Sequence, residues 1–184
     1  MTVLCLLHQI QTMIALDLER CLMADNPWWR IHELKLALGT VEHRLKSGFF
    51  AESDAASHEG EAFFTQMLIC LNDAVMFLSQ NNDRITLDGD VQPFNEKEQD
   101  VTDLINRFRN IACHLPSDQR SIGDDMRVGF NVLRGKASMR INGQMLVADY
   151  DDDVAFFYGV HRIYLNRHVR AAWTEAVERL KKYQ

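Results

Sequence analysis

The stretch HEGEAFFTQMLICLNDAVMFLSQ, residues 58–80, repeats an apolar side chain at every third or fourth position. An α-helix turns once in 3.6 residues, so this spacing places the following side chains on one face: Phe63, Phe64, Met67, Leu71, Val75 and Leu78. An apolar face of this length needs a partner surface to exclude water. This one segment therefore predicts a packed helical domain.

The segments on either side show the same period. Helices are predicted over residues 2–24, over residues 28–45 after an Asn26-Pro27 start signal, over residues 95–114, and over residues 151–180. The helix at residues 95–114 is predicted to begin with a capping box of Asn95 and Glu98 and to end near His114, because Pro116 disfavours helical geometry at Leu115. Residues 51–57 are predicted to form a loop, and Asp88-Gly89 indicates a turn within a short hairpin.

The period changes between Arg127 and Val147, where alternating and β-branched residues surround Asn142-Gly143. This dipeptide favours a two-residue hairpin turn, so a β-hairpin is predicted within about residues 126–149. The resulting fold class is all-α: an up-and-down bundle of four to five helices with a small β-hairpin inserted before the last one. No composition break divides the chain, and we interpret residues 1–184 as a single domain.

The charge is unevenly distributed. The net charge is -6, but residues 1–100 carry 7 Lys and Arg against 16 Asp and Glu, whereas residues 101–184 carry 13 against 10. An anion-binding surface is therefore expected in the second half. With no signal peptide and no long apolar run, the sequence predicts a cytoplasmic protein without membrane contact, whose four scattered cysteines are reduced.

The sequence lacks the motifs of several common kinds of enzyme. The sequence has no glycine-rich phosphate loop, no G-x-S-x-G and no H-E-x-x-H. Cys5 and His8 have no second pair at zinc-binding spacing, and the Asp149–Asp153 cluster lacks the glycine and glutamate of a calcium loop. No metal site and no cofactor are predicted.

The segment Arg109-Asn110-Ile111-Ala112-Cys113-His114 ends the helix predicted at residues 95–114. Such an R-N-x-x-x-H arrangement is short enough to arise by chance, and Arg107 with His114 and Arg162 with His168 also fit an Arg followed at similar spacing by a His. Arg109 is preferred because a polar residue follows it, whereas Phe108 follows Arg107 and Ile163 follows Arg162.

In this motif, in its place late in a helix and in the order of its predicted helices, the chain resembles the HEPN superfamily, helical domains of many prokaryotic toxins and abortive-infection systems. The resemblance implies a metal-independent endoribonuclease, in which an RNA 2'-hydroxyl attacks its own phosphodiester. His114 would transfer the proton, Arg109 would stabilise charge on phosphorus, and Asn110 and Arg107 would bind substrate. A cognate antitoxin protein is implied as a partner.

Spacing constrains that reaction. Five residues of helix turn through about 500°, which leaves the Arg109 and His114 side chains about 140° apart. They converge only if the helix end unwinds at Leu115-Pro116 or if two copies of the motif meet across a dimer. The resemblance implies that two copies of the motif meet in a homodimer. A different class of function stays open: a non-catalytic HEPN-like module that binds a nucleotide, a nucleic acid or a partner protein. A purely structural oligomerising domain is a third alternative, because Arg and His in a last helical turn also complement the helix dipole.

Overall fold

The computed structural model describes residues 27–92, 99–114, 120–122, 126–127 and 129–183. Its helices are α2 (Pro27–Lys46), α3 (His58–Gln80), α4 (Val101–Cys113) and α5 (Ala171–Leu180), with two short 3₁₀ turns, η1 (Phe49–Ala51) and η2 (Ser53–Ala56), between α2 and α3. The helices predicted at residues 28–45 and 58–80 are confirmed. The helix predicted at residues 2–24 lies outside the described residues.

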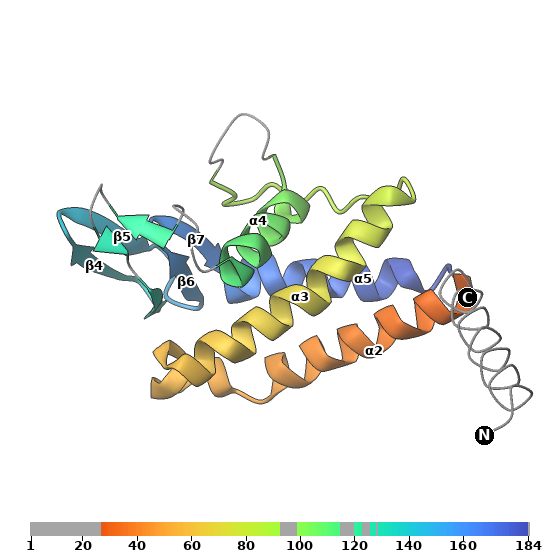
Figure 1. Ribbon diagram of the computed structural model, residues 1–184, viewed down its shortest axis with the longest axis horizontal. Coiled ribbons are helices and arrows are strands. Elements are labelled where there is room, and N and C mark those ends of the chain that lie inside the picture. Colours follow the sequence, from red (N-terminus) through yellow and green to blue (C-terminus); the bar gives the residue numbers. More distant parts are fainter. Residues whose placement is uncertain (1–26, 93–98, 115–119, 123–125, 128, 184) are drawn as a thin grey trace, which may run out of the picture.

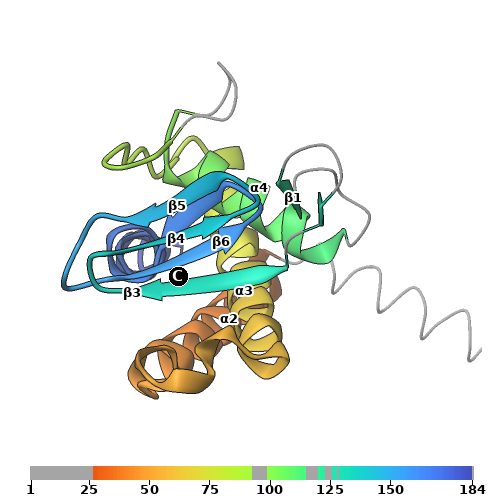
Figure 2. The same cartoon turned by 90° about the vertical axis from the view of Figure 1, so that its left-hand side faces the viewer.

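The strands overturn the all-α prediction. The strands are β1 (Ser121–Ile122), β2 (Met126–Arg127), β3 (Phe130–Arg134), β4 (Ala137–Ile141), β5 (Gln144–Ala148), β6 (Val154–Tyr158) and β7 (His161–Tyr164). They form antiparallel sheets in the orders β3-β6-β7, β4-β5 and β1-β2. The strands gather at one end of the helices (Figure 1). Figure 2 looks at that end and shows β3 beside β6, with the β4–β5 hairpin next to them. The protein is therefore mixed α/β, not a helical bundle.

The hairpin predicted at Asn142-Gly143 is confirmed. Ile141 pairs with Gln144 across a two-residue turn in which Asn142 and Gly143 both have positive φ, 46° and 80°. These angles are those of a type I′ turn, whose twist matches that of the flanking strands. No strand is found in residues 83–92, so the hairpin considered around Asp88-Gly89 is reduced to a turn in the described residues.

The helix predicted over residues 151–180 is wrong in its first half. Val154–Tyr158 is a strand with five consecutive buried residues, lying between β3 and β7. A strand covered on both faces shows an unbroken apolar run instead of an alternating one, and the same run also fits a helical period. Gly159, with φ 56°, turns the chain back into β7. The helical region begins only at Leu165.

That region opens with a π-helical turn, η4 (Leu165–Arg170), which leads directly into α5. The buried carboxylate of Asp153 caps its first turn: Oδ1 accepts from the backbone N–H of Asn166 at 2.8 Å and Oδ2 from that of Arg167 at 3.1 Å. Asp153, which directly precedes β6 in the chain, therefore caps this turn. Short π-helical segments are rare and occur often at functional sites.

The helix α4 starts later than predicted. Its N-cap is Asp100, whose side chain accepts from the backbone N–H of Asp103 at 3.2 Å, so the helix begins at Val101 instead of Asn95. Asn95 and Glu98 themselves lie outside the described residues. The predicted end near His114 is confirmed, because His114 is the C-cap.

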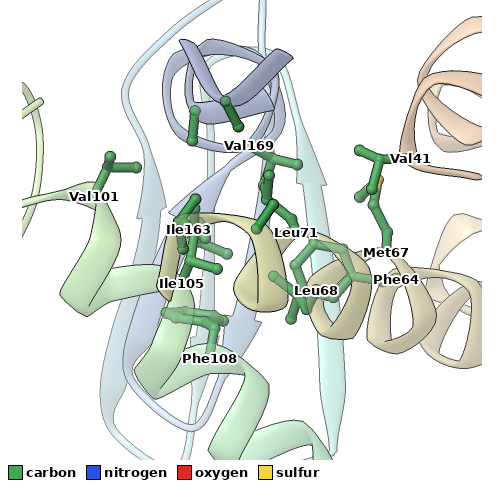
Figure 3. Packing of buried hydrophobic residues seen from close by; sticks show 14 of the residues in the cluster. Val41, Phe64, Met67, Leu68, Leu71, Val101, Ile105, Phe108, Ile163 and Val169 are labelled. Carbon is green, nitrogen blue, oxygen red and sulfur yellow. The ribbon is translucent and has the colours of Figure 1, made fainter. Parts of the chain in front are cut away.

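The core lies between α3 and the elements that surround it. Figure 3 shows Phe64, Leu68 and Leu71 of α3 amid side chains from α2, α4, β7 and η4, among them Val41, Ile105, Phe108, Ile163 and Val169. The Phe64 ring stacks on Phe156 of β6, with centroids 4.1 Å apart. By length and composition alone α3 could cross a membrane, but it contacts α2, α4 and α5 and contributes side chains to this core. The core joins the sheet to the helices as one packed unit.

Candidate functional site

The predicted Arg109–His114 pair is not brought together within one chain. Arg109 is half-buried, and its Nη1 donates to Asn110 Oδ1 at 3.0 Å. His114 is exposed and has left helical geometry, with φ −111° and ψ 87°. Because α4 stays helical through Cys113, the two side chains leave it in different directions. In the described part of the chain, no hydrogen bond or ion pair links them.

Arg107 does not fit a substrate-binding role. Its side chain is buried, and Nη2 lies 3.4 Å from the carbonyl oxygen of Gln92. It also lies close enough to His161 to lower the pKa of that imidazole, which burial chiefly depresses to about 4. A guanidinium held in this way stabilises the fold and is not presented to a ligand.

The alternative pair, Arg162 and His168, is also structural. Arg162 Nη1 donates to Asp149 Oδ2 and to the carbonyl oxygen of Val147, both at 2.6 Å. His168 is buried, and its Nδ1 accepts from the backbone N–H of Tyr164 while Nε2 lies 3.0 Å from the carbonyl oxygen of Gly89. A carbonyl only accepts, so Nε2 carries the proton and the ring is neutral. Burial lowers the pKa of His168 accordingly.

The structure sorts the basic residues of the second half into two groups. Several are held by carboxylates, for example Arg120 by Glu61 at 3.2 Å and Arg179 by Asp83 at 3.1 Å. Others make no ion pair in the described part of the chain. Besides Arg109 of α4, these include Arg134, Lys136, Arg140 and Arg170, which lie on the β3–β4 segment and on η4.

Two residues of the second group, Arg134 and Arg170, line a cleft together with Arg44 of α2. The cleft holds about 360 Å³ and lies where the end of α2 meets η1, β3, the start of β6 and η4. This volume is at the lower end of the range of small-ligand sites. Arginine residues from three separate elements therefore line one hollow.

Each guanidinium is held in place without a carboxylate. Arg134 Nε donates to the carbonyl oxygen of Phe50 at 3.2 Å. Arg170 Nε donates to Asn166 Oδ1 at 2.9 Å, and its Nη2 lies 3.4 Å from the carbonyl oxygen of Leu45. Neutral partners position an arginine but leave its charge uncompensated, and further N–H groups remain for a ligand.

Arg44 sits differently. Its guanidinium carbon lies 3.7 Å from the centre of the Phe63 ring, and Nη2 lies 3.3 Å from Gln66 Oε1. Its Nε is buried and has no hydrogen-bond partner in the described structure. Stacking on an aromatic ring fixes the plane of a guanidinium and keeps its charge.

Three aspartates share the wall of this cleft. Asp152 and Asp153 both form an ion pair with Arg167 at 3.0 Å, so one guanidinium is shared by two carboxylates. Asp151 is exposed and has no ion pair in the described residues. Together with Arg167, the three lining arginines give four positive charges against the three aspartates, so the formal balance of the cleft is slightly positive and favours an anion over a metal cation.

By its fold and its site, the protein is a mixed α/β domain with an arginine-lined cleft. No family model, no curated protein and no solved structure matches the chain. The resemblance to the HEPN superfamily therefore depends on the motif at Arg109 and stays a prediction, and the mixed fold departs from the bundle that it implies.

Sequence reasoning missed the cleft because its arginines are distant in the chain. Arg44, Arg134 and Arg170 belong to no motif, and only the fold brings them together. The positive balance of residues 101–184 pointed to the right half for two of them. It gave no reason to choose Arg44, which lies in the acidic half.

Proposed function

We propose that the protein binds a phosphate-bearing ligand in the cleft lined by Arg44, Arg134 and Arg170, and that this ligand is RNA. The observation that carries the proposal is one hollow lined by three arginines that make no ion pair in the described residues. Two of them, Arg134 and Arg170, have their guanidinium groups bonded to oxygens of other residues that line the hollow. Guanidinium groups match phosphate oxygens in geometry and in charge. This is a binding function, the class left open by the sequence beside catalysis.

The surface beyond the cleft favours a polymer over a free nucleotide. Lys136 follows Gly135, which lines the cleft, and Arg140 lies farther along β4. Both side chains are exposed, and neither makes an ion pair in the described residues. The alternation of β4 places residues 138 and 140 on one face, and Lys136 lies in the bend directly before this strand. A row of cations that continues past a cleft suits several successive phosphates of a strand.

Binding of a fluorescein-labelled single-stranded RNA, followed by fluorescence anisotropy, tests the proposal. Loss of one charge-assisted contact costs about 1.5–3 kcal/mol, so Arg134→Ala and Arg170→Ala should each weaken binding roughly tenfold to hundredfold. Lys181→Ala is the matched control, because Lys181 is exposed at the far end of α5 and pairs with Glu178. Equal affinities for the wild type and both arginine variants would contradict the proposal. Competition by ATP at the same strength as by RNA would reassign the site to nucleotides.

A second candidate is the endoribonuclease that the HEPN resemblance implies, with Arg109 and His114 as its catalytic pair. What favours it is the exposure of His114 at the end of α4, where an imidazole is open to substrate. The two side chains are not joined within one chain, and the resemblance implies that the Arg109 of one protomer meets the His114 of another. This candidate therefore includes a homodimer, and its test is set out in the Discussion.

A further inference from the structure

The β4–β5 hairpin has one face packed inside the protein and one face outside it. The inward residues join a small hydrophobic cluster with side chains of β6 and β7, and they are Met139, Ile141, Leu146 and Ala148. The alternation of the two strands turns the residues between them outward: Ser138, Arg140, Met145 and Val147. All four outward side chains are exposed. We call this set the outer hairpin face.

The outer hairpin face combines apolar side chains with a positive charge. Met145 is 50% exposed and Val147 is 39% exposed. Arg140 is the cross-strand partner of Met145, and Ser138 is that of Val147. Directly opposed residues of an antiparallel pair project from the same face and lie close enough to act together. Arg140 makes no ion pair in the described part of the chain, so its charge is open to an anionic partner.

The base of the hairpin lies at the wall of the arginine cleft. Gly135, two residues before β4, and Asp151, three residues after β5, both line the cleft. The hairpin begins there with the pair Ala137 and Ala148, and its strands run side by side at the left-hand end of the molecule (Figure 1). At about 3.3 Å per residue, the chain from Gly135 to Arg140 spans roughly 16 Å. The outer hairpin face therefore continues the surface of the cleft.

We propose that the outer hairpin face binds unpaired bases of the RNA whose phosphates lie in the arginine cleft. This inference rests on the proposed RNA-binding function and narrows its ligand to a single strand. Arg140 pairs with a phosphate, and Met145 and Val147 contact the faces of the bases. The thioether of methionine is polarisable and makes favourable contacts with aromatic rings. Bases in a duplex stack on one another, so they present no free faces to such a surface.

Charge and size both favour a nucleic-acid strand over a protein partner. Lys136 and Arg140 lie between the cleft and the far end of the hairpin without an ion pair in the described residues, which suits a continuous row of phosphates. A stable protein interface buries about 800 Å² on each partner around an apolar centre. Two exposed apolar side chains are few for such a centre, whereas a single strand needs only one or two side chains for each base.

The double variant Met145→Gln/Val147→Thr tests the inference by fluorescence anisotropy. Both substitutions keep the approximate shape of an exposed side chain and reduce its apolar surface. Affinity for a fluorescein-labelled single-stranded RNA of about twelve nucleotides should fall roughly threefold to tenfold. The salt dependence of binding should stay that of the wild type, because no charge is removed. Val160→Thr is the matched control, since Val160 is a 46% exposed valine in the turn between β6 and β7, and it should bind as the wild type does.

A strand of the same length without bases shows whether the lost contact is made to bases. It carries the same phosphates, so the wild type and the double variant should bind it with equal affinity. A loss as large for the abasic strand as for the normal strand would overturn the inference, and so would equal competition by a double-stranded RNA.

Two further outcomes separate this inference from the proposed function. Unchanged affinity of the double variant, beside weaker binding by Arg134→Ala, would overturn the inference, leave the outer hairpin face to a protein partner and keep the cleft as the RNA site. Failure of the wild type to bind any RNA would contradict the proposed function itself, and the inference with it.

Discussion

Arg134 Nε donates to the carbonyl oxygen of Phe50 at 3.2 Å, although 84 residues separate them in the chain. The bond ties β3 to the η1 turn and holds one guanidinium at the wall of the cleft. An ordered donor loses less side-chain entropy when a ligand binds than a mobile one does. The cleft is thus arranged before its ligand arrives, which is what a binding site requires.

Substitution of Asp151 should change the RNA affinity in the direction opposite to substitution of the cleft arginines. It is the cleft carboxylate without an ion pair in the described residues, and it repels a phosphate placed among the arginines. Asp151→Asn keeps the shape and removes the charge, so RNA affinity should rise about twofold to fivefold, in keeping with a solvent-exposed charge interaction. Anisotropy titration at low salt measures the change. A fall in affinity would mean that the aspartate wall binds a cation or a basic group of the ligand.

Asp153 should contribute far more to the stability of the fold than the neighbouring Asp152. Its carboxylate is fully buried and accepts from the backbone N–H groups of Val154, Asn166 and Arg167 and from the Arg167 guanidinium. Asp153→Ala leaves those donors unsatisfied and should lower the free energy of unfolding by about 2–4 kcal/mol. Urea denaturation measures this value.

Asp152→Ala is the matched control for that experiment. Asp152 also pairs with Arg167, but its side chain is 77% exposed. Exposed ion pairs contribute little, so the loss should stay under about 1 kcal/mol. Equal losses for the two variants would show that the buried cap does not hold the π-helical turn in place.

Burial of two neutral histidines predicts how stability depends on pH. Burial, with a smaller contribution from Arg107, lowers the pKa of His161 to about 4, and burial also lowers the pKa of His168. Between pH 6.5 and 4 the unfolded chain binds a proton at His161 and the folded chain does not, and the lowered pKa of His168 acts in the same direction. The stabilisation that comes from keeping His161 neutral is therefore fully present above about pH 6.5 and is lost as the pH decreases toward 4.

The contribution of His161 to this fall is up to about 3 kcal/mol, from 1.36 kcal/mol per pKa unit. His161→Gln removes its titration, so the free energy of unfolding should decrease less steeply between pH 6.5 and 4.5 than in the wild type. Urea denaturation at a series of pH values gives the two slopes. Identical slopes would show that His161 binds its proton in the folded state as readily as in the unfolded state.

The ribonuclease candidate has a direct test. Purified protein is incubated with RNA in excess EDTA, beside His114→Ala and Arg109→Ala. Cleavage that persists in EDTA and is lost in both variants is expected if these residues act as proton-transfer group and phosphate-charge stabiliser. DNA of the same sequence should stay intact, because it lacks the 2'-hydroxyl. Absence of cleavage by the wild type at every concentration would leave binding as the function.

The sequence predicted the elements that local rules determine and missed those that tertiary context determines. The helix at residues 58–80 follows from its period, and the hairpin follows from Asn142-Gly143. Val154–Tyr158 was assigned to a helix because its apolar residues fit both periods. It forms a strand because β3 and β7 pair with its two edges, while its alternate side chains enter the two hydrophobic clusters on either face. The cleft could not be predicted, because 126 residues separate Arg44 from Arg170 and no local pattern relates them.

The salt dependence of RNA binding tests the central claim most directly. For single strands the logarithm of the affinity falls with the logarithm of the salt concentration, with a slope of about −0.7 per phosphate neutralised. Removing one cleft arginine, in Arg134→Ala or Arg170→Ala, should make the slope less steep by about 0.7, and Lys181→Ala should leave it unchanged. A slope that is the same in all four proteins would contradict phosphate binding by the arginine cleft.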